Sequence, residues 1–70
     1  MAYGNKIKVL RRKKRITQKE AAEKIGVTLS AWTKYETEKR IPRDDIKVKI
    51  AILLDASVQM IFYDSQEVKP

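Results

Sequence analysis

Apolar residues recur at intervals of three and four residues along most of the chain, a spacing typical of amphipathic helices. Tyr3, Ile7 and Leu10 share one stripe and predict a first helix that runs from about Tyr3 to Lys14. The other faces of this helix are strongly basic. Ile16 is the first apolar residue after the basic run, and we expect it to enter the core where the chain turns.

Residues 17–36 contain two helix starts about eleven residues apart. Thr17 and Glu20 form a Thr-x-x-Glu capping box, in which each side chain binds a backbone N–H at the other end of the turn. Gly26 is expected to close this helix, because glycine readily adopts the left-handed conformation that ends a helix. Thr28 is a second N-cap candidate and opens a helix that runs to the end of the stretch. A helix, a glycine turn and a second helix form a helix-turn-helix signature.

Two further helices are predicted in the second half of the chain. One starts at Asp44 or Asp45, since acidic residues are favourable at a helix N-terminus, and the other is short and capped by Ser57. Their apolar positions are Ile46, Ile50, Leu53 and Leu54, and then Val58, Met60, Ile61 and Phe62. We therefore expect an all-α fold, a compact bundle of five short helices, in one domain over residues 1–63. The tail, residues 64–70, has no pattern that assigns a structure.

The helix that Thr28 opens has two different faces, at about 100° per residue. One face carries Trp32 and Tyr35, flanked by Ala31 and Glu36, and is expected to pack in the core. The other face is small, polar and basic, and it carries Ser30, Thr33, Lys34 and Thr37, with Leu29 at its margin. Taken alone, this second face is most simply an ordinary solvated surface. Together with the glycine turn and the charge pattern, it indicates a face that reads a DNA groove.

The net charge of +7 is unevenly distributed. The first 15 residues contain seven basic residues and no acidic one, whereas residues 50–70 contain one basic and three acidic residues. A basic front and a slightly acidic back suit a domain that binds a polyanion. The run from Arg11 to Arg15 also suits a helix C-terminus, where cations are favourable.

The composition excludes several classes of function. The chain has no cysteine and no histidine, which excludes disulfides, thiol catalysis, zinc fingers and histidine-based acid–base chemistry. No spacing of paired carboxylates, metal ligands or phosphate-loop glycines is present, so we expect neither an enzyme nor a cofactor. The longest apolar run, Ile50 to Leu54, is too short to span a membrane. The N-terminus carries no hydrophobic signal segment, so a cytoplasmic location is expected.

From about Gly4 to Phe62 the sequence resembles the phage Cro and CI repressors and the wider Xre-type regulators. The resemblance is carried, in order, by Leu10-Arg11, Thr17-Gln18, Ala22, Ile25-Gly26-Val27, Tyr35-Glu36, Lys39-Arg40-Ile41-Pro42, Ile50-Ala51 and Ser57-Val58. It implies a lambda-repressor-like fold. Ala21 departs from the leucine that is usual in this family, and it leaves room in the core that Trp32 is expected to fill.

The resemblance also implies a function, that of a sequence-specific DNA-binding transcriptional regulator, a small repressor of phage or mobile-element type. Arg11 and Glu36 match a family pair that ties the first helix to the third. The third helix would enter the major groove, and the base-reading residues would be Leu29, Ser30, Thr33 and Lys34. The DNA backbone would be held by Gln18, Thr28, Lys39, Arg40 and Arg43.

The expected partner is a double-stranded DNA operator with two-fold symmetry, bound by a homodimer, since one such domain covers little DNA and family members usually bind as dimers. The expected dimer contact is Ile61, Phe62 and Tyr63. Alternatively, Ile61 and Phe62 close the core of the monomer. An alternative function is that of an antitoxin or anti-regulator module that uses the same fold to bind a protein partner.

Overall fold

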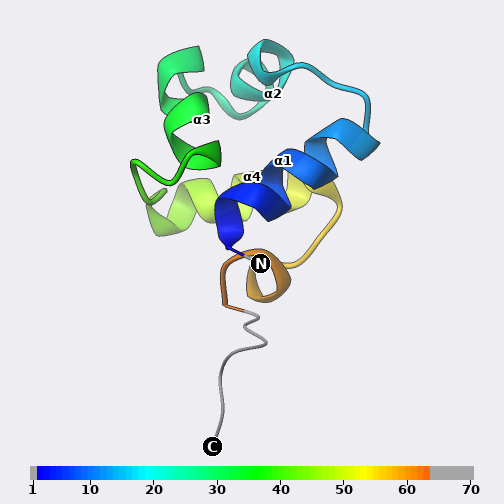
Figure 1. The fold of residues 1–70 in the computed structure, drawn as a ribbon, viewed down its shortest axis with the longest axis vertical. Helices are drawn as coiled ribbons and strands as arrows, with labels where there is room; N and C mark the ends of the chain where they lie inside the picture. Colours follow the sequence, from blue (N-terminus) through cyan, green and yellow to red (C-terminus); the bar gives the residue numbers. More distant parts are fainter. Residues whose placement is uncertain (1, 64–70) are drawn as a thin grey trace, which may run out of the picture.

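The computed structural model describes residues 2–63, which form four α-helices and a short π-helical turn (Figure 1). The helices are α1 (Tyr3–Lys13), α2 (Gln18–Ile25), α3 (Leu29–Glu36) and α4 (Asp44–Leu54), and the turn η1 spans Gln59–Tyr63. Residues 2–63 contain no strand, so the predicted all-α bundle of five short helical elements is confirmed. No helix in this part of the chain is long and apolar enough to cross a membrane. The expected tail, residues 64–70, lies outside the described residues.

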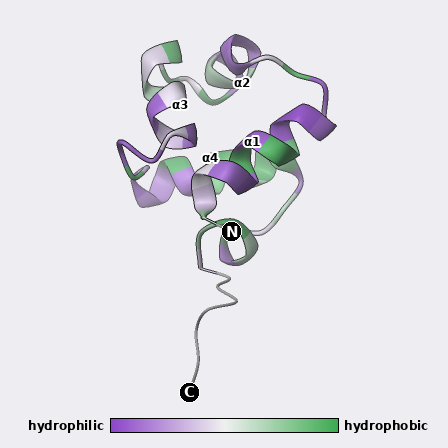
Figure 2. Ribbon diagram, in the orientation of Figure 1, coloured by the Kyte–Doolittle hydropathy of each residue, from purple (hydrophilic) through white to green (hydrophobic). Residues whose placement is uncertain are grey.

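The helix-turn-helix pair and the C-terminal turn lie at opposite ends of the molecule (Figure 1). Helix α3 packs against α1 and α2, and α4 also packs against α1 and α2. The turn η1 packs against α1, beside the N-terminus of the chain. Hydrophilic residues cover the C-terminal end of α1 and the loop after α3 (Figure 2).

Local hydrogen bonds fix the ends of α2 and α3 where the sequence predicts them. The Thr17 hydroxyl accepts from the Glu20 backbone N–H at 3.0 Å, and the Glu20 carboxylate accepts from the Thr17 backbone N–H at 2.7 Å. Gly26 closes α2 with φ of 77°, a left-handed conformation that other residues adopt less readily. The Thr28 hydroxyl then accepts from the Ala31 backbone N–H at 3.0 Å and begins α3.

Helix α1 begins through a contact that no local pattern predicts. Its N-cap residue, Ala2, makes no side-chain capping bond. Instead the Glu38 carboxylate accepts from the Gly4 backbone N–H at 3.0 Å, across 34 residues of sequence. Gly4 lies so close to the end of α3 that an added Cβ would collide with the Glu36 carbonyl oxygen. Gly4 and Glu38 therefore join the start of α1 to the chain that follows α3.

The core contains the apolar residues that the sequence places inside. Four large side chains are fully buried: Trp32, Ile7, Ile50 and Ile61. Trp32 is 0% exposed, and so is the small residue Ala21 of α2, the helix that packs against α3. The prediction that Trp32 is a core residue is confirmed.

The C-terminal turn corrects one part of the expected dimer contact. The Ser57 hydroxyl accepts from the Met60 backbone N–H at 2.9 Å, as expected for a cap, but the turn that follows is π-helical. Ile61 is 1% exposed and belongs to the core of the monomer, so it has no surface to offer a second copy and its assignment to the dimer contact is wrong. Phe62 is half-buried, and Tyr63 is 54% exposed.

Lys47 holds the C-terminal turn against α4. Its Nζ lies 5.4 Å from the centroid of the Phe62 ring and 4.8 Å from that of Tyr63, and it donates to the Tyr63 hydroxyl at 2.8 Å. The Phe62 ring also lies 5.6 Å from the Tyr3 ring, centroid to centroid. Cation–π and aromatic contacts of this kind join α1, α4 and η1.

Candidate nucleic-acid interface

Helix α3 presents its polar side outward, as the sequence predicts. Ala31, Trp32 and Tyr35 are buried on its inner side. On the outer side Ser30 and Lys34 are exposed, and the apolar side chain of Leu29 is 46% exposed. An exposed large apolar residue next to small polar ones suits a groove that displays thymine methyl groups.

Two threonine hydroxyls, one in α3 and one at its C-cap, donate hydrogen bonds to backbone carbonyls of the helix. The half-buried Thr33 donates from its hydroxyl to the Ser30 backbone carbonyl at 2.9 Å. Thr37 donates in the same way to the Thr33 carbonyl at 2.9 Å. The Thr33 hydroxyl proton is therefore engaged within the helix, and its oxygen remains an acceptor towards a ligand.

Three of the five residues expected at the DNA backbone gather beside the start of α3. Thr28, Arg40 and Arg43 line one surface hollow. The apolar residues Ile41 and Ile46 also line it. Arg40 is held through its backbone, because its carbonyl accepts from the Tyr3 hydroxyl at 3.2 Å.

The other two expected backbone residues, Lys39 and Gln18, do not line this hollow. Lys39 is exposed in the loop after α3. Gln18 is half-buried in the first turn of α2, and its amide Nε2 donates to Glu36 Oε1 at 2.9 Å.

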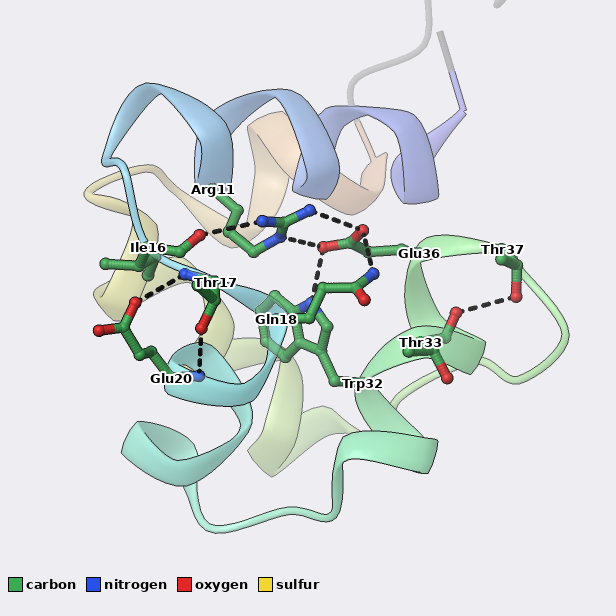
Figure 3. Close-up of polar contacts among 9 residues, drawn as sticks. All are labelled: Arg11, Ile16, Thr17, Gln18, Glu20, Trp32, Thr33, Glu36 and Thr37. Carbon is green, nitrogen blue, oxygen red and sulfur yellow. Dashed lines mark hydrogen bonds and ion pairs between the residues drawn. The ribbon is translucent and has the colours of Figure 1, made fainter.

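Glu36 is the centre of a buried polar network that joins three helices (Figure 3). Its Oε2 accepts from Arg11 Nε and from Trp32 Nε1, both at 2.6 Å, and its Oε1 accepts from Arg11 Nη2 at 3.3 Å as well as from Gln18. Arg11 also donates from Nη1 to the Ile16 carbonyl at 2.9 Å. The Arg11–Glu36 pair that the resemblance implied is therefore present, with side chains only 10% and 3% exposed.

The environment of Glu36 favours its charged form. Burial alone would raise the pKa of this carboxyl group, but hydrogen bonds from Arg11, Gln18 and Trp32 and the positive charge of Arg11 lower the pKa below its usual value. A carboxylate has about four lone-pair sites, and here four donors occupy them. No buried side-chain polar atom in residues 2–63 lacks a partner.

Sequence reasoning missed two of the donors to Glu36. Trp32 precedes Glu36 by four residues in one helix, so their spacing could have indicated a contact. Gln18 is separated from Glu36 by 18 residues, and nothing in the local pattern marks this contact.

Residues 7–61, more than half of the chain, match the sequence pattern of a protein family described as helix-turn-helix. The chain belongs to the helix-turn-helix family. Two curated relatives from Bacillus subtilis (strain 168) are HTH-type transcriptional regulators. ImmR is 34% identical over 61 residues, which are 87% of this chain and 48% of ImmR. YobD, which is described as uncharacterized, is 37% identical over 59 residues, which are 84% of this chain and 53% of YobD. The chain thus spans about half the length of the curated relatives it matches.

Among solved structures, this helix-turn-helix protein matches the P22 c2 repressor protein, crystallised in complex with synthetic operator 9T in the presence of Tl⁺. The TM-score is 0.88 at 20% sequence identity, over 93% of this chain and 98% of the other. At this identity the match establishes the fold, and it confirms the lambda-repressor-like architecture that the sequence indicates.

Proposed function

We propose that this protein is a sequence-specific DNA-binding transcriptional regulator, a small repressor of phage or mobile-element type. The observation that carries the proposal is the outer face of α3, where Leu29, Ser30 and Lys34 are exposed opposite the buried Trp32 and Tyr35. The names of the curated relatives and the operator bound by the structural neighbour support it. They also favour a regulator over an antitoxin or anti-regulator.

In this proposal α3 enters the major groove and its outer residues read base edges. Lys34 donates to guanine O6 or N7, and Leu29 contacts a thymine methyl group. Ser30 hydrogen-bonds a base edge as donor or acceptor. Thr33, whose hydroxyl proton is engaged by the Ser30 carbonyl, accepts from the exocyclic amine of cytosine or adenine.

The DNA backbone is held on both sides of α3. Thr28, Arg40 and Arg43, which line one hollow, bind phosphates next to the start of α3. Lys39 adds a phosphate contact from the following loop. Gln18 binds a further phosphate together with the backbone N–H groups at the start of α2.

Two copies are proposed to bind a two-fold symmetric operator, with their α3 helices about 34 Å apart, one turn of DNA. The proposed self-contact is Tyr63 with the exposed part of Phe62, at the end of the molecule opposite the helix-turn-helix pair. Because the ligand is genomic or phage DNA, the proposed place of action is the bacterial nucleoid, in the cytoplasm.

Footprinting on the DNA that flanks the gene, at two salt concentrations, tests the function. We expect a protected site with a dyad and an affinity that falls steeply with salt. Protection that is absent, or equal on unrelated DNA at both concentrations, would contradict the proposal.

Two lysine variants separate base reading from backbone binding. Lys34→Ala should relax preference at one or two base positions, by roughly 1–3 kcal/mol each. Its matched control, Lys39→Ala, removes the same side chain from the loop and should weaken all sequences alike, lowering the salt slope by about one unit. If Lys34→Ala weakens all sequences uniformly, α3 does not read bases through Lys34.

A further inference from the structure

Gln18 contacts the far end of the helix-turn-helix pair rather than only its own helix. It lies in the first turn of α2, and its amide reaches Glu36 in the last turn of α3, where Nε2 donates to Oε1 at 2.9 Å (Figure 3). Gln18 is the residue that the proposed function assigns to a DNA phosphate at the start of α2. A group that holds the Gln18 amide in one orientation therefore influences how Gln18 binds the DNA phosphate.

The chemistry of Glu36 determines which end of the Gln18 amide faces the protein. An ionised carboxylate only accepts hydrogen bonds, so the amide must turn its NH₂ group towards Glu36 and its carbonyl oxygen away. One N–H of that NH₂ group donates to Glu36, and the other remains available to a second acceptor. A phosphate oxygen is such an acceptor.

The negative charge of Glu36 does not oppose a phosphate at this place, because Arg11 neutralises it. Arg11 donates to both carboxylate oxygens, at 2.6 Å and 3.3 Å. The Glu36 side chain is 3% exposed, and Trp32 occupies another of its acceptor sites. The network as a whole is neutral and held from three helices.

We infer that Glu36 is a positioning residue for DNA binding, which holds the Gln18 amide in the orientation that binds a DNA phosphate. The inference rests on the proposed function and deepens it. A side chain that is already fixed loses less conformational entropy on binding than a freely rotating one. The phosphate contact of α2 is thus set in the free protein by a carboxylate at the end of α3, and Glu36 itself does not touch DNA.

A double-mutant cycle tests the inference. The Arg11→Met/Glu36→Leu pair removes the carboxylate and its counterion together, so that no unpaired charge is left in the core. In the wild-type background, Gln18→Ala should lower operator affinity roughly 10- to 100-fold, as expected for a lost hydrogen bond to a charged group. In the paired background, the same substitution should cost no more than about threefold, because the amide is no longer positioned. An equal cost in both backgrounds would overturn the inference.

Trp32→Phe is the matched control for loosening of the network. It removes the donor to Glu36 Oε2 but keeps Oε1, the atom that Gln18 binds. In the Trp32→Phe background, Gln18→Ala should therefore keep its full cost. If that cost disappears there too, general loosening explains the effect, and the specific role of Glu36 is refuted.

A measurement without DNA separates failure of the inference from failure of the function. In nuclear magnetic resonance spectra of the free wild-type protein, the two side-chain amide protons of Gln18 should differ from those of the exposed Gln59 and should exchange more slowly with water. Signals of Gln18 that coincide with those of Gln59 would overturn the inference, whether or not the variants fold. If Gln18 is fixed but the wild-type protein shows no sequence preference on DNA, the proposed function fails and the role of Glu36 in DNA binding falls with it.

Discussion

Replacing Trp32 by alanine tests how much its buried side chain contributes to the free energy of unfolding. Trp32 is the largest of the fully buried side chains, with 0% exposure, and it belongs to α3, which packs against α1 and α2. Substitutions of a buried tryptophan by alanine usually cost about 3–5 kcal/mol, through lost transfer free energy and the cavity that remains. We expect Trp32→Ala to fall in the upper half of this range, because the buried residues of α2 beside it include Ala21 and Ala22. Such small side chains cannot expand into the space.

This cost is large compared with the stability of a small domain. At about 0.05–0.15 kcal/mol per residue, a domain of this length has a free energy of unfolding of roughly 4–10 kcal/mol. Trp32→Ala should therefore remove about half of it or more. Trp32→Phe keeps most of the apolar volume and loses the hydrogen bond to Glu36, so it should cost less, about 1.5–3 kcal/mol.

Urea denaturation, followed by the helical circular dichroism signal, measures both variants without using the tryptophan as the probe. We expect the midpoint to fall in the order wild type, Trp32→Phe, Trp32→Ala, with similar slopes. An unchanged midpoint for Trp32→Ala would refute the burial argument. Equal midpoints for the two variants would show that the indole N–H, rather than the volume of the ring, provides the stability.

Two further predictions concern the contacts of α1 and the charge of Glu36. Gly4→Ala should lower the free energy of unfolding by roughly 1–3 kcal/mol, because the new Cβ collides with the Glu36 backbone carbonyl. Thermal melting measures the effect, and Asn5→Ala at an exposed position is a control that should change the melting temperature little. An unchanged melting temperature for Gly4→Ala would contradict the close approach of Gly4 to α3. The lowered pKa of Glu36 predicts a stabilising contribution that is present above the unfolded value of about 4.5 and is lost as the pH falls through the lower folded pKa. Arg11→Met/Glu36→Leu should therefore lose less stability than the wild type between pH 5 and pH 2, roughly the range over which buried paired carboxylates protonate, and identical acid profiles would contradict the assignment.

The ends of the helices could be predicted because neighbouring residues determine them. The capping box of Thr17 and Glu20, the left-handed Gly26 and the cap at Thr28 all act within four residues, and each occurs where the sequence places it. The inner and outer faces of α3 could be predicted for the same reason, since helical spacing alone separates Trp32 from Lys34.

Contacts between distant residues could not be predicted in this way. The cap that Glu38 provides for α1 joins residues 34 positions apart. Ile61 was assigned to the wrong surface because a core and a dimer contact both require an apolar residue, and no pattern separates them. The side chain of Lys47 is only 12% exposed although it is charged, because the aromatic rings of Phe62 and Tyr63, 15 and 16 positions later, lie against it.

Contacts between distant residues also explain how the position of α3 can be fixed while the residues on its proposed reading face vary. Glu36 fixes α3 from within, through Arg11 of α1 and Gln18 of α2. The outward residues Ser30 and Lys34 have no part in that network, since their side chains point to the other side of the helix. The contacts that orient α3 and the contacts proposed to choose a DNA sequence are therefore assigned to separate residues of one eight-residue helix. If the proposed function holds, changes on the outer face should alter which bases are read without moving α3.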